Sequence, residues 1–302
     1  MIKDKESQRV INKFIITAVL LFICLMWTIP TIGIFITSFR TADATNSTGW
    51  WKAFSTIKSF TLDNYNQVLF GQRYNVGNAS GTTAIRGATM LSAFLSSITV
   101  TVPAVIIPIF IAAAAAYGFA WLNFKGRGVL LAMIIALLVV PLQISLIPIL
   151  RDYNKIGLNG SYLGIWLAHA GFGLPLATYM MFNYISALPR SILESAFMDG
   201  ASHFTTFVRL ILPLSVPAIA SFAIFQFIWV WNDMLVSLVF LSGAGQKVEV
   251  VTVRLMNMAG TRGTDWHLLT AGAFVSLLLP LCVFLGLQKF FVRGLLAGSV
   301  KG

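Results

Sequence analysis

Residues 188–213 read LPRSILESAFMDGASHFTTFVRLILP and form a short polar segment between two long apolar ones. The segment carries five ionisable side chains: Arg190, Glu194, Asp199, His203 and Arg209. In a chain that is 57% hydrophobic and only 10% charged, such a concentration of polar groups needs a reason. We therefore expect this segment to have a role of its own, separate from that of the apolar runs on either side.

The composition predicts an integral membrane protein. The 302 residues have a mean hydropathy of +0.83, and uncharged apolar runs recur along the chain. About 20 helical residues are needed to cross the roughly 30 Å hydrocarbon core of a bilayer, and several runs reach that length. We predict an all-α, polytopic protein with six transmembrane helices.

Charge and motifs exclude several other classes of protein. The net charge of +11 comes from basic residues that stand singly in loops and tails, which is typical of membrane-helix flanks and not of a nucleic-acid surface. The three histidines are too far apart in sequence to share a metal, and no Gly-x-x-x-x-Gly-Lys-Ser/Thr loop occurs. We expect no metal or cofactor in this chain, and no ATP hydrolysis by it alone.

The apolar runs divide the chain. We predict, in order, a cytoplasmic N-terminal segment (1–13), a first transmembrane helix (14–39), an extracytoplasmic loop (40–86), a core of five transmembrane helices (87–291) and a cytoplasmic tail (292–302). Within the core, the spans are expected at 87–124, 128–150, 162–185, 214–241 and 268–290. The orientation depends mainly on the basic cluster before the first span, because the basic residues of all loops and tails together divide almost evenly, with 11 inside and 10 outside.

The polar segment has the local pattern of two short helices. Ser191 and Glu194 stand at the spacing of a capping box, just after Pro189, so a helix is predicted to begin there. Asp199-Gly200 is expected to end it, because glycine readily takes the left-handed conformation that closes helices.

A second helix is predicted after Ser202, which can cap it. Its apolar residues recur at the spacing of one helix face: Phe204, Phe207, Val208 and Ile211. An amphipathic pair of this kind could simply lie on the membrane surface, and that alternative stays open. A plain connection between two spans, however, could be much shorter.

Three motifs in this segment carry a family resemblance. Glu194-Ser195-Ala196, Asp199-Gly200-Ala201 and Leu212-Pro213 resemble the E-A-A…D-G-A…I-x-L-P loop of binding-protein-dependent ABC importer permeases. Two positions depart from that pattern, since Ser195 replaces an alanine and Leu210 replaces an isoleucine. Both changes are small or conservative, so a surface loop should tolerate them.

The resemblance covers essentially the whole chain. Further matching segments are Phe124-Lys-Gly126-Arg127, Pro141…Ile147-Pro148, Gly157-Leu158, Trp231-Asn232-Asp233 and the tail from Gly294 to Gly302. They are similar to the carbohydrate-uptake branch, to the smaller of the two maltose-type permease subunits, and within it to α-glucoside or glucosylglycerol permeases.

The resemblance implies a type I ABC importer permease fold in the cell (inner) membrane, with both termini cytoplasmic. It implies three kinds of partner besides lipid: a second homologous permease, two ATPase subunits that bind ATP and Mg²⁺, and an extracytoplasmic sugar-binding protein. Residues 188–213 would be the coupling loop, with Glu194 as a polar anchor and Gly200 as a bend. The implied ATPase-coupling residues are Glu194, Ser195, Ala196, Asp199, Gly200, Ala201, Phe204, Phe207, Leu212 and Pro213.

Candidates for the substrate pathway lie on the predicted fifth span. They are Gln226, Trp229, Asn232, Asp233 and Ser237. An ionisable group inside a membrane helix is a functional candidate, and amide, carboxylate and indole groups together suit a sugar. Asp233, however, lies roughly 30 Å along that helix, so the outer interface or a structural hydrogen bond is an equal possibility.

Two other functions were weighed. The cargo could be an amino acid, a phosphate or a metal instead of a sugar. A membrane-embedded enzyme that modifies glycosyl or lipid groups would need paired acidic groups or histidines at the membrane face. The chain has only ten acidic residues, and none forms a plausible pair.

Overall fold

The computed structural model describes residues 2–55, 59–71, 73–78, 81–86, 89–241, 248–259 and 265–297, and their side chains apart from 2–10, 73–86, 259 and 290–297. The predicted tail, 292–302, therefore lies partly outside the described residues. The chain forms two compact units, one from Met1–Gly87 with Asn257–Val275 and the other from Ala88–Met256 with Ser276–Gly302. Each unit is described by itself.

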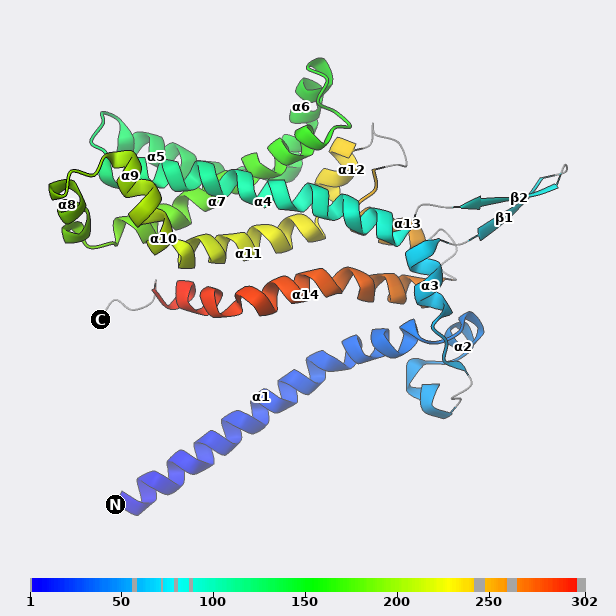
Figure 1. The fold of residues 1–302 in the computed structure, drawn as a ribbon. Helices are drawn as coiled ribbons and strands as arrows, with labels where there is room; N and C mark the ends of the chain where they lie inside the picture. The colour runs from blue at the N-terminus through cyan, green and yellow to red at the C-terminus, as the bar shows by residue number, and fades with distance from the viewer. Residues whose placement is uncertain are drawn as a thin grey trace. The chain divides into compact units, whose positions relative to one another are not determined.

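The first unit holds the N-terminal helix and a small polar cap (Figure 1). Its elements are α1 (Ile2–Ser38), α2 (Ala42–Ser47), η1 (Trp50–Ser55), α3 (Asp63–Phe70), β1 (Arg73–Asn78) and β2 (Gly81–Arg86). The helix α3 lies within the loop predicted at 40–86. The strands β1 and β2 form an antiparallel hairpin, so the prediction of an all-α chain was wrong at this point.

Asn64 fastens the cap to the end of α1. Its buried side-chain amide donates to the carbonyl oxygens of Ser38, at 2.9 Å, and Arg40, at 2.8 Å. The hydroxyls of Ser38 and Tyr65 share a hydrogen bond of 2.7 Å. Because the last carbonyls of a helix have no partner inside that helix, these bonds supply one where α1 ends.

The second unit contains the rest of the apolar helices. Its elements are α4 (Met90–Trp121), α5 (Arg127–Ala136), η3 (Leu137–Val139), α6 (Leu142–Lys155), α7 (Tyr162–Ser186), α8 (Arg190–Met198), α9 (His203–Thr206), η4 (Phe207–Ile211), α10 (Leu212–Leu214), α11 (Val216–Asn232) and α12 (Leu235–Leu241). The two remaining helices, α13 (Val251–Ala259) and α14 (Trp266–Ala297), contribute residues to both units. The helix α14 therefore continues into the region predicted as a tail.

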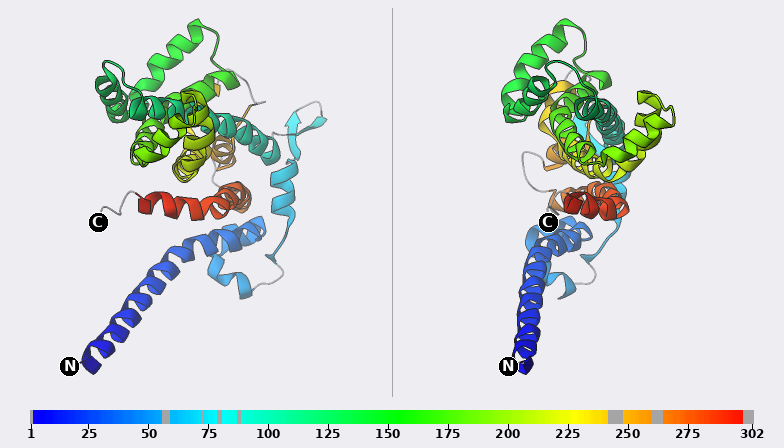
Figure 2. Two further views of the ribbon diagram at one scale, coloured as in Figure 1. Left: turned by 60° about the vertical axis from the view of Figure 1, so that its left-hand side comes forward. Right: turned by 90° about the vertical axis from the view of Figure 1, so that its left-hand side faces the viewer.

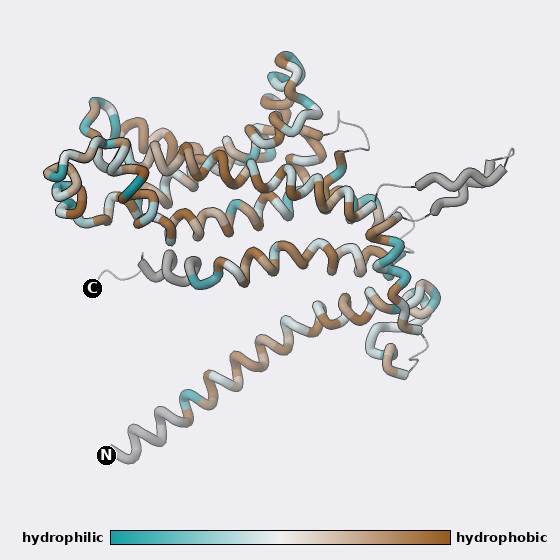
Figure 3. Tube along the Cα trace, in the orientation of Figure 1, coloured by the Kyte–Doolittle hydropathy of each residue, from teal (hydrophilic) through white to brown (hydrophobic). Residues whose placement is uncertain are grey.

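Four described helices are long and apolar enough to cross a membrane: Ile11–Ser38, Met90–Trp121, Tyr162–Ser186 and Trp266–Lys289. Two bent helix pairs bring the number to six if each pair is one span. Hydrophobic residues run along α4, α7 and α11, whereas hydrophilic ones gather at the turn between α8 and α9 (Figure 3).

The bent pairs correct two predicted spans. The third span, expected as one helix, turns by 104° between η3 and α6, at Pro141, which has no backbone N–H to continue the helix. The α6 helix then runs to Lys155, inside the predicted outer loop. The fifth span turns by 69° between α10 and α11 and is interrupted again after α11.

The core of the second unit forms where α4, α7 and α11 lie side by side, as all the views in Figures 1 and 2 show. Small residues on α4, among them Ala112, Ala113 and Ala116, are buried there, so the helices approach closely. Gln226 of α11 is buried at the contact, where its amide nitrogen donates to the carbonyl oxygens of Ala104 and His169, at 3.2 Å each.

Gly173 of α7 makes room for that amide. A Cβ atom added at Gly173 would lie 2.5 Å from the Gln226 side chain, which is well inside contact distance. A Cβ at Gly171, on the same helix, would meet nothing within 4 Å. The three-helix contact therefore depends on one glycine and not on the other.

We expect Gly173→Ala to lower the free energy of unfolding by about 1–3 kcal/mol, because overpacking displaces the bonded Gln226 amide. Gly171→Ala is the matched control and should be neutral or slightly stabilising. Thermal unfolding of both purified variants in detergent measures the difference. Equal midpoints for the two variants would contradict the close packing of α7 on α11.

Candidate functional site

The polar segment begins with α8, which ends in a Schellman motif. The backbone N–H of Ala201 donates to the carbonyl of Ala196 at 3.0 Å, and the N–H of Gly200 donates to that of Phe197 at 3.0 Å. Gly200 has φ +80°, which confirms the predicted left-handed closing residue. The pattern A…D-G-A thus has a structural meaning, because its two alanines, Ala196 and Ala201, are the residues joined by the first of these hydrogen bonds.

The start of α8 differs from the prediction. The helix begins at Arg190 with Pro189 as its N-cap, and no side chain caps it, so the expected capping box of Ser191 and Glu194 was wrong. Proline has no side-chain oxygen, so it cannot accept from the N–H groups of the first turn as a capping serine would. The cap predicted for the second helix is confirmed, since the Ser202 hydroxyl accepts from the N–H of Thr205 at 3.2 Å.

The second helix does not present one apolar face. After α9 the backbone widens into the π-helical turn η4, which changes the direction of the side chains within this turn. Ile211 is fully buried and Phe207 packs in the same core cluster, whereas Phe204 is 76% exposed and Val208 is 41% exposed. The prediction of a single face was therefore wrong.

One side of the segment is bound to α4. The Tyr117 hydroxyl of α4 lies 2.9 Å from Nδ1 of His203, and its ring lies 5.3 Å from that of Phe207. The His203 ring also contacts Phe197 of α8, with centroids 4.9 Å apart. Leu193 is buried in the core cluster that also contains Tyr117. Both short helices are thus attached to a membrane-length helix.

The other side of the segment is exposed. Glu194, Ser195, Asp199 and Gly200 are all exposed, and so is Pro213, while Ala196, Ala201 and Leu212 are half-buried. Met198 is 88% exposed, and sequence reasoning missed it. Its position gave a signal, because it lies five residues, or about 140° around a helix, from the buried Leu193. Met198 and Phe204 thus present apolar side chains to the surroundings.

Asp233 lies at the break between α11 and α12. Its carboxylate accepts from the N–H groups of Val236, at 3.4 Å, and Ser237, at 3.1 Å, and so caps α12. Its backbone carbonyl accepts from the Thr252 hydroxyl at 2.7 Å. The predicted fifth span, 214–241, is therefore two helices. The contacts of Asp233 are those of the alternative in which its side chain makes a structural hydrogen bond.

The Asp233 carboxylate also faces His169 of α7, which is fully buried. The distance between its Oδ2 and the histidine Nε2 is 3.4 Å, within range for an ion pair. The other ring nitrogen, Nδ1, lies 3.2 Å from the carbonyl of Ile165, which can only accept, so Nδ1 carries a hydrogen. A polar cluster therefore joins α7 to the break in the fifth span.

The remaining pathway candidates separate in space. Gln226 is used in helix contacts, and Ser237 is buried beside the Asp233 cap. Asn232 is exposed and donates to the carbonyl of Ile228 at 2.8 Å. Trp229 stacks edge-on against His169 and lines a cavity of about 380 Å³ beside Tyr153 and Phe172. The direct sugar contact of these residues stays a prediction.

A comparison with known protein families matches residues 104–296 to the family described as binding-protein-dependent transport system inner membrane component. The match includes the whole polar segment and the fifth and sixth predicted spans. The chain belongs to this family. It is a permease, a non-catalytic membrane subunit of an importer, so the alternative of a membrane-embedded enzyme does not hold.

Two similar proteins are named for transport. The permease is 52% identical over 293 residues to the osmoprotective compounds uptake permease protein GgtD of Synechocystis sp. PCC 6803, covering 96% of this chain and 93% of the relative. It is 55% identical over 253 residues to the alpha-glucoside transport system permease protein AglG of Rhizobium meliloti, covering 82% of this chain and 62% of the relative.

The fold of the permease is similar to that of a solved importer. A chain from a bacterial ABC transporter that imports the acidic polysaccharide alginate matches with a TM-score of 0.71 at 22% identity, over 94% of this chain and 98% of the other. The predicted permease fold is thereby confirmed, with four to six apolar helices in the described part of the chain.

We expect Gly200→Ala to weaken the closure of α8, because alanine is strained at φ +80°, by about 1 kcal/mol. Gly200→Asn should be affected less, since asparagine tolerates the left-handed region. Hydrogen exchange at the amides of Gly200 and Ala201 measures the closure. Unchanged protection in Gly200→Ala would contradict the Schellman motif.

Asp233→Ala should destabilise the α11–α12 break by about 1 kcal/mol through loss of the cap, whereas Asp233→Asn should keep the cap. Thermal unfolding distinguishes the two variants. If both variants lowered the unfolding temperature equally, the negative charge facing His169 would contribute more to stability than the cap.

Proposed function

We propose that this permease is a pore-forming subunit of an ATP-driven importer for a sugar, most closely an α-glucoside or related glycoside. The observation that carries the coupling part is the two-sided polar segment. One side is bound to α4, while Glu194, Met198 and Phe204 are exposed on the other. Such a surface suits docking to a partner whose movement must reach the membrane helices.

The partner that fits this surface is an ATPase subunit. A surface that combines exposed apolar side chains with polar residues is typical of a protein–protein interface, and Glu194 would supply a polar anchor in it. ATP and Mg²⁺ would be bound by two ATPase subunits, not by this chain. A second homologous permease and an extracytoplasmic sugar-binding protein would complete the importer.

In the proposed topology the bent pair of residues 127–155 is one span, and α11 with α12 forms another span after the coupling loop. Six spans then place both termini and the coupling loop, 188–213, in the cytoplasm of a cell with the permease in its inner membrane. The basic residues before α1 support this orientation. The loop at 40–86 would face the opposite side.

The proposed cargo is supported by the relatives and by the cavity beside Trp229. AglG is named for α-glucosides and GgtD for osmoprotective compounds. A glycoside fits both names, because an α-glucoside is a glycoside and a glycoside can be an osmoprotective compound. An indole next to a tyrosine and a phenylalanine offers stacking faces for a sugar ring. A non-sugar solute remains the second candidate, and screening ligands of the cognate binding protein tests it.

Met198→Glu and Phe204→Glu should each reduce co-purification of the ATPase subunit about tenfold or more, because a buried charge replaces an apolar contact. Phe124→Glu is the control, an exposed aromatic outside the segment. The amounts of both proteins after affinity purification give the ratio. Normal co-purification of both variants would exclude this surface as the docking site.

Trp229→Ala should raise the substrate concentration for half-maximal uptake by about tenfold, since a stacking face is worth roughly 1–3 kcal/mol. Ile228→Ala, on an exposed neighbour in α11, should leave it unchanged. Radiolabelled glycoside uptake in vesicles measures both. If Trp229→Ala left the substrate concentration for half-maximal uptake unchanged, the substrate contacts would lie elsewhere. The coupling proposal would not be affected.

A further inference from the structure

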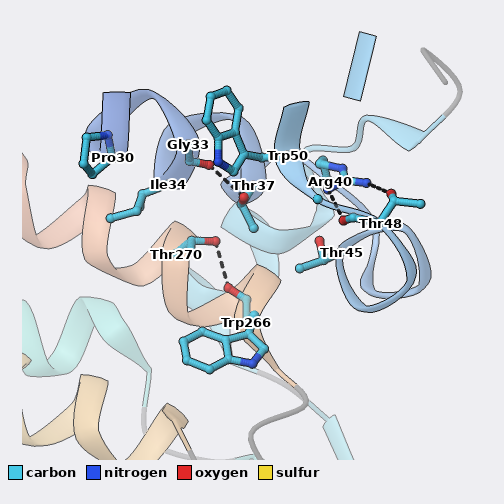
Figure 4. Close-up of a pocket in the computed structure, with 11 residues that line it drawn as sticks. Pro30, Gly33, Ile34, Thr37, Arg40, Thr45, Thr48, Trp50, Trp266 and Thr270 are labelled. Atoms are coloured by element: carbon cyan, nitrogen blue, oxygen red, sulfur yellow. Dashed lines mark hydrogen bonds between the residues drawn. The ribbon is translucent and has the colours of Figure 1, made fainter. Parts of the chain in front are cut away.

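A second pocket lies in the first unit, at the end of α1. It has a volume of about 310 Å³, at the lower end of the range for ligand sites. Figure 4 shows side chains from α1, from the cap and from the start of α14 around it. The sugar importer proposed above gives this pocket no role.

The lining of the pocket changes from apolar to polar along α1. Pro30, Gly33 and Ile34 belong to the apolar stretch Ile11–Ser38, whereas Arg40, Thr45 and Thr48 follow it. The pocket therefore reaches from the apolar part of α1 to the polar residues that follow it. A ligand that fills it should have an apolar end and a polar end in the same order.

Arg40 is a buried cation with only neutral partners. It is 1% exposed, and its guanidinium donates to the carbonyls of Ala44, at 2.7 Å, and Thr48, at 2.9 Å, and to the Thr48 hydroxyl. No carboxylate of the described residues lies within ion-pair distance of it. Burial lowers the pKa of Arg40 below its ordinary value. Burying a charge without an opposite one is costly, so an anion is favoured here.

Two donors in this pocket have no partner. Nε of Arg40 and the hydroxyl of Thr45 are buried and make no hydrogen bond. In Figure 4 the Thr45 oxygen stands near Arg40 without a dashed line. Both groups can donate, and the guanidinium can only donate, so the missing ligand atom must be an acceptor. A phosphate oxygen is negatively charged and only accepts.

Two indoles line the same pocket. Trp50 lies against α1 at Gly33, where an added Cβ would be 2.8 Å from its ring nitrogen, and Trp266 begins the last apolar helix. Tryptophan is enriched at the headgroup level of membranes. A sugar could use the indoles and hydroxyls, but it would not offset the charge of Arg40 or fill the apolar end.

We propose that this pocket binds a glycerophospholipid, with the phosphodiester facing Arg40 and Thr45 and an acyl chain along Pro30 and Ile34. The occupant is a membrane lipid because the pocket joins an apolar end and a polar end, as a phospholipid does.

Native mass spectrometry of the full-length permease, in a detergent without a sugar headgroup, tests the proposal with dioleoylphosphatidylglycerol. The wild-type protein should retain one lipid, and Thr45→Val should bind it about tenfold or more weakly, because one hydrogen bond to a charged group is lost. Thr28→Val, whose hydroxyl bonds only the Cys24 carbonyl of the same helix, should bind like wild type. Arg40→Gln should bind most weakly.

Two further ligands separate the parts of the lipid. Dioleoylglycerol, which lacks the phosphate, and glycerol 3-phosphate, which lacks the chains, should both bind more weakly than the whole lipid. Equal retention of dioleoylglycerol, equal binding by Thr45→Val and Thr28→Val, or displacement of the lipid by an α-glucoside would each overturn the proposal. Valine keeps the shape of the Thr45 side chain, and Arg40 donates its hydrogen bonds to Ala44 and Thr48 instead. Weaker lipid binding by Thr45→Val would therefore not come from the loss of those Arg40 hydrogen bonds.

Discussion

Backbone groups released at a helix end must find partners within the chain when the surroundings are apolar, and the polar residues of this permease gather where that demand arises. An unpaired N–H or carbonyl in hydrocarbon costs several kcal/mol. Asn64 meets the demand where α1 ends, and Asp233 meets it where α11 gives way to α12. Two of the few polar side chains of this chain thus stand at helix ends that would otherwise leave backbone groups unpaired.

The same constraint gives the polar segment, residues 188–213, its shape. A Schellman closure at Gly200 and a cap from Ser202 satisfy the two helix ends, so the turn between them is defined without partner proteins. The π-helical turn then separates Phe204, which faces outward, from Ile211, which is buried. A short helix pair that is bound by one side to α4 and exposed on the other can transmit a displacement as a unit.

Much of this was predictable from sequence. Apolar run lengths gave the four long apolar helices, and Asp199-Gly200 and Ser202 gave the helix end and start, because these signals are local. The turn at Pro141, the break at Asp233 and the outward position of Met198 depend on which neighbours pack against them, and the hairpin 73–86 carries no strong strand pattern. Gln226 and Asp233 could be named as polar groups in a membrane helix, but their partners on α4 and α7 were not visible in the sequence.

The proposed mechanism requires that the polar segment, residues 188–213, and α4 move together. Spin labels can be placed at Ser191 of α8 and Phe110 of α4, which are both exposed, after Cys24 and Cys282 are replaced by serine. Double electron–electron resonance then measures the distance between the two labels. In the assembled importer, the account predicts the same narrow distance distribution with and without ATP. A distribution that shifts or broadens when ATP binds would show that the loop moves against α4, and would contradict the account.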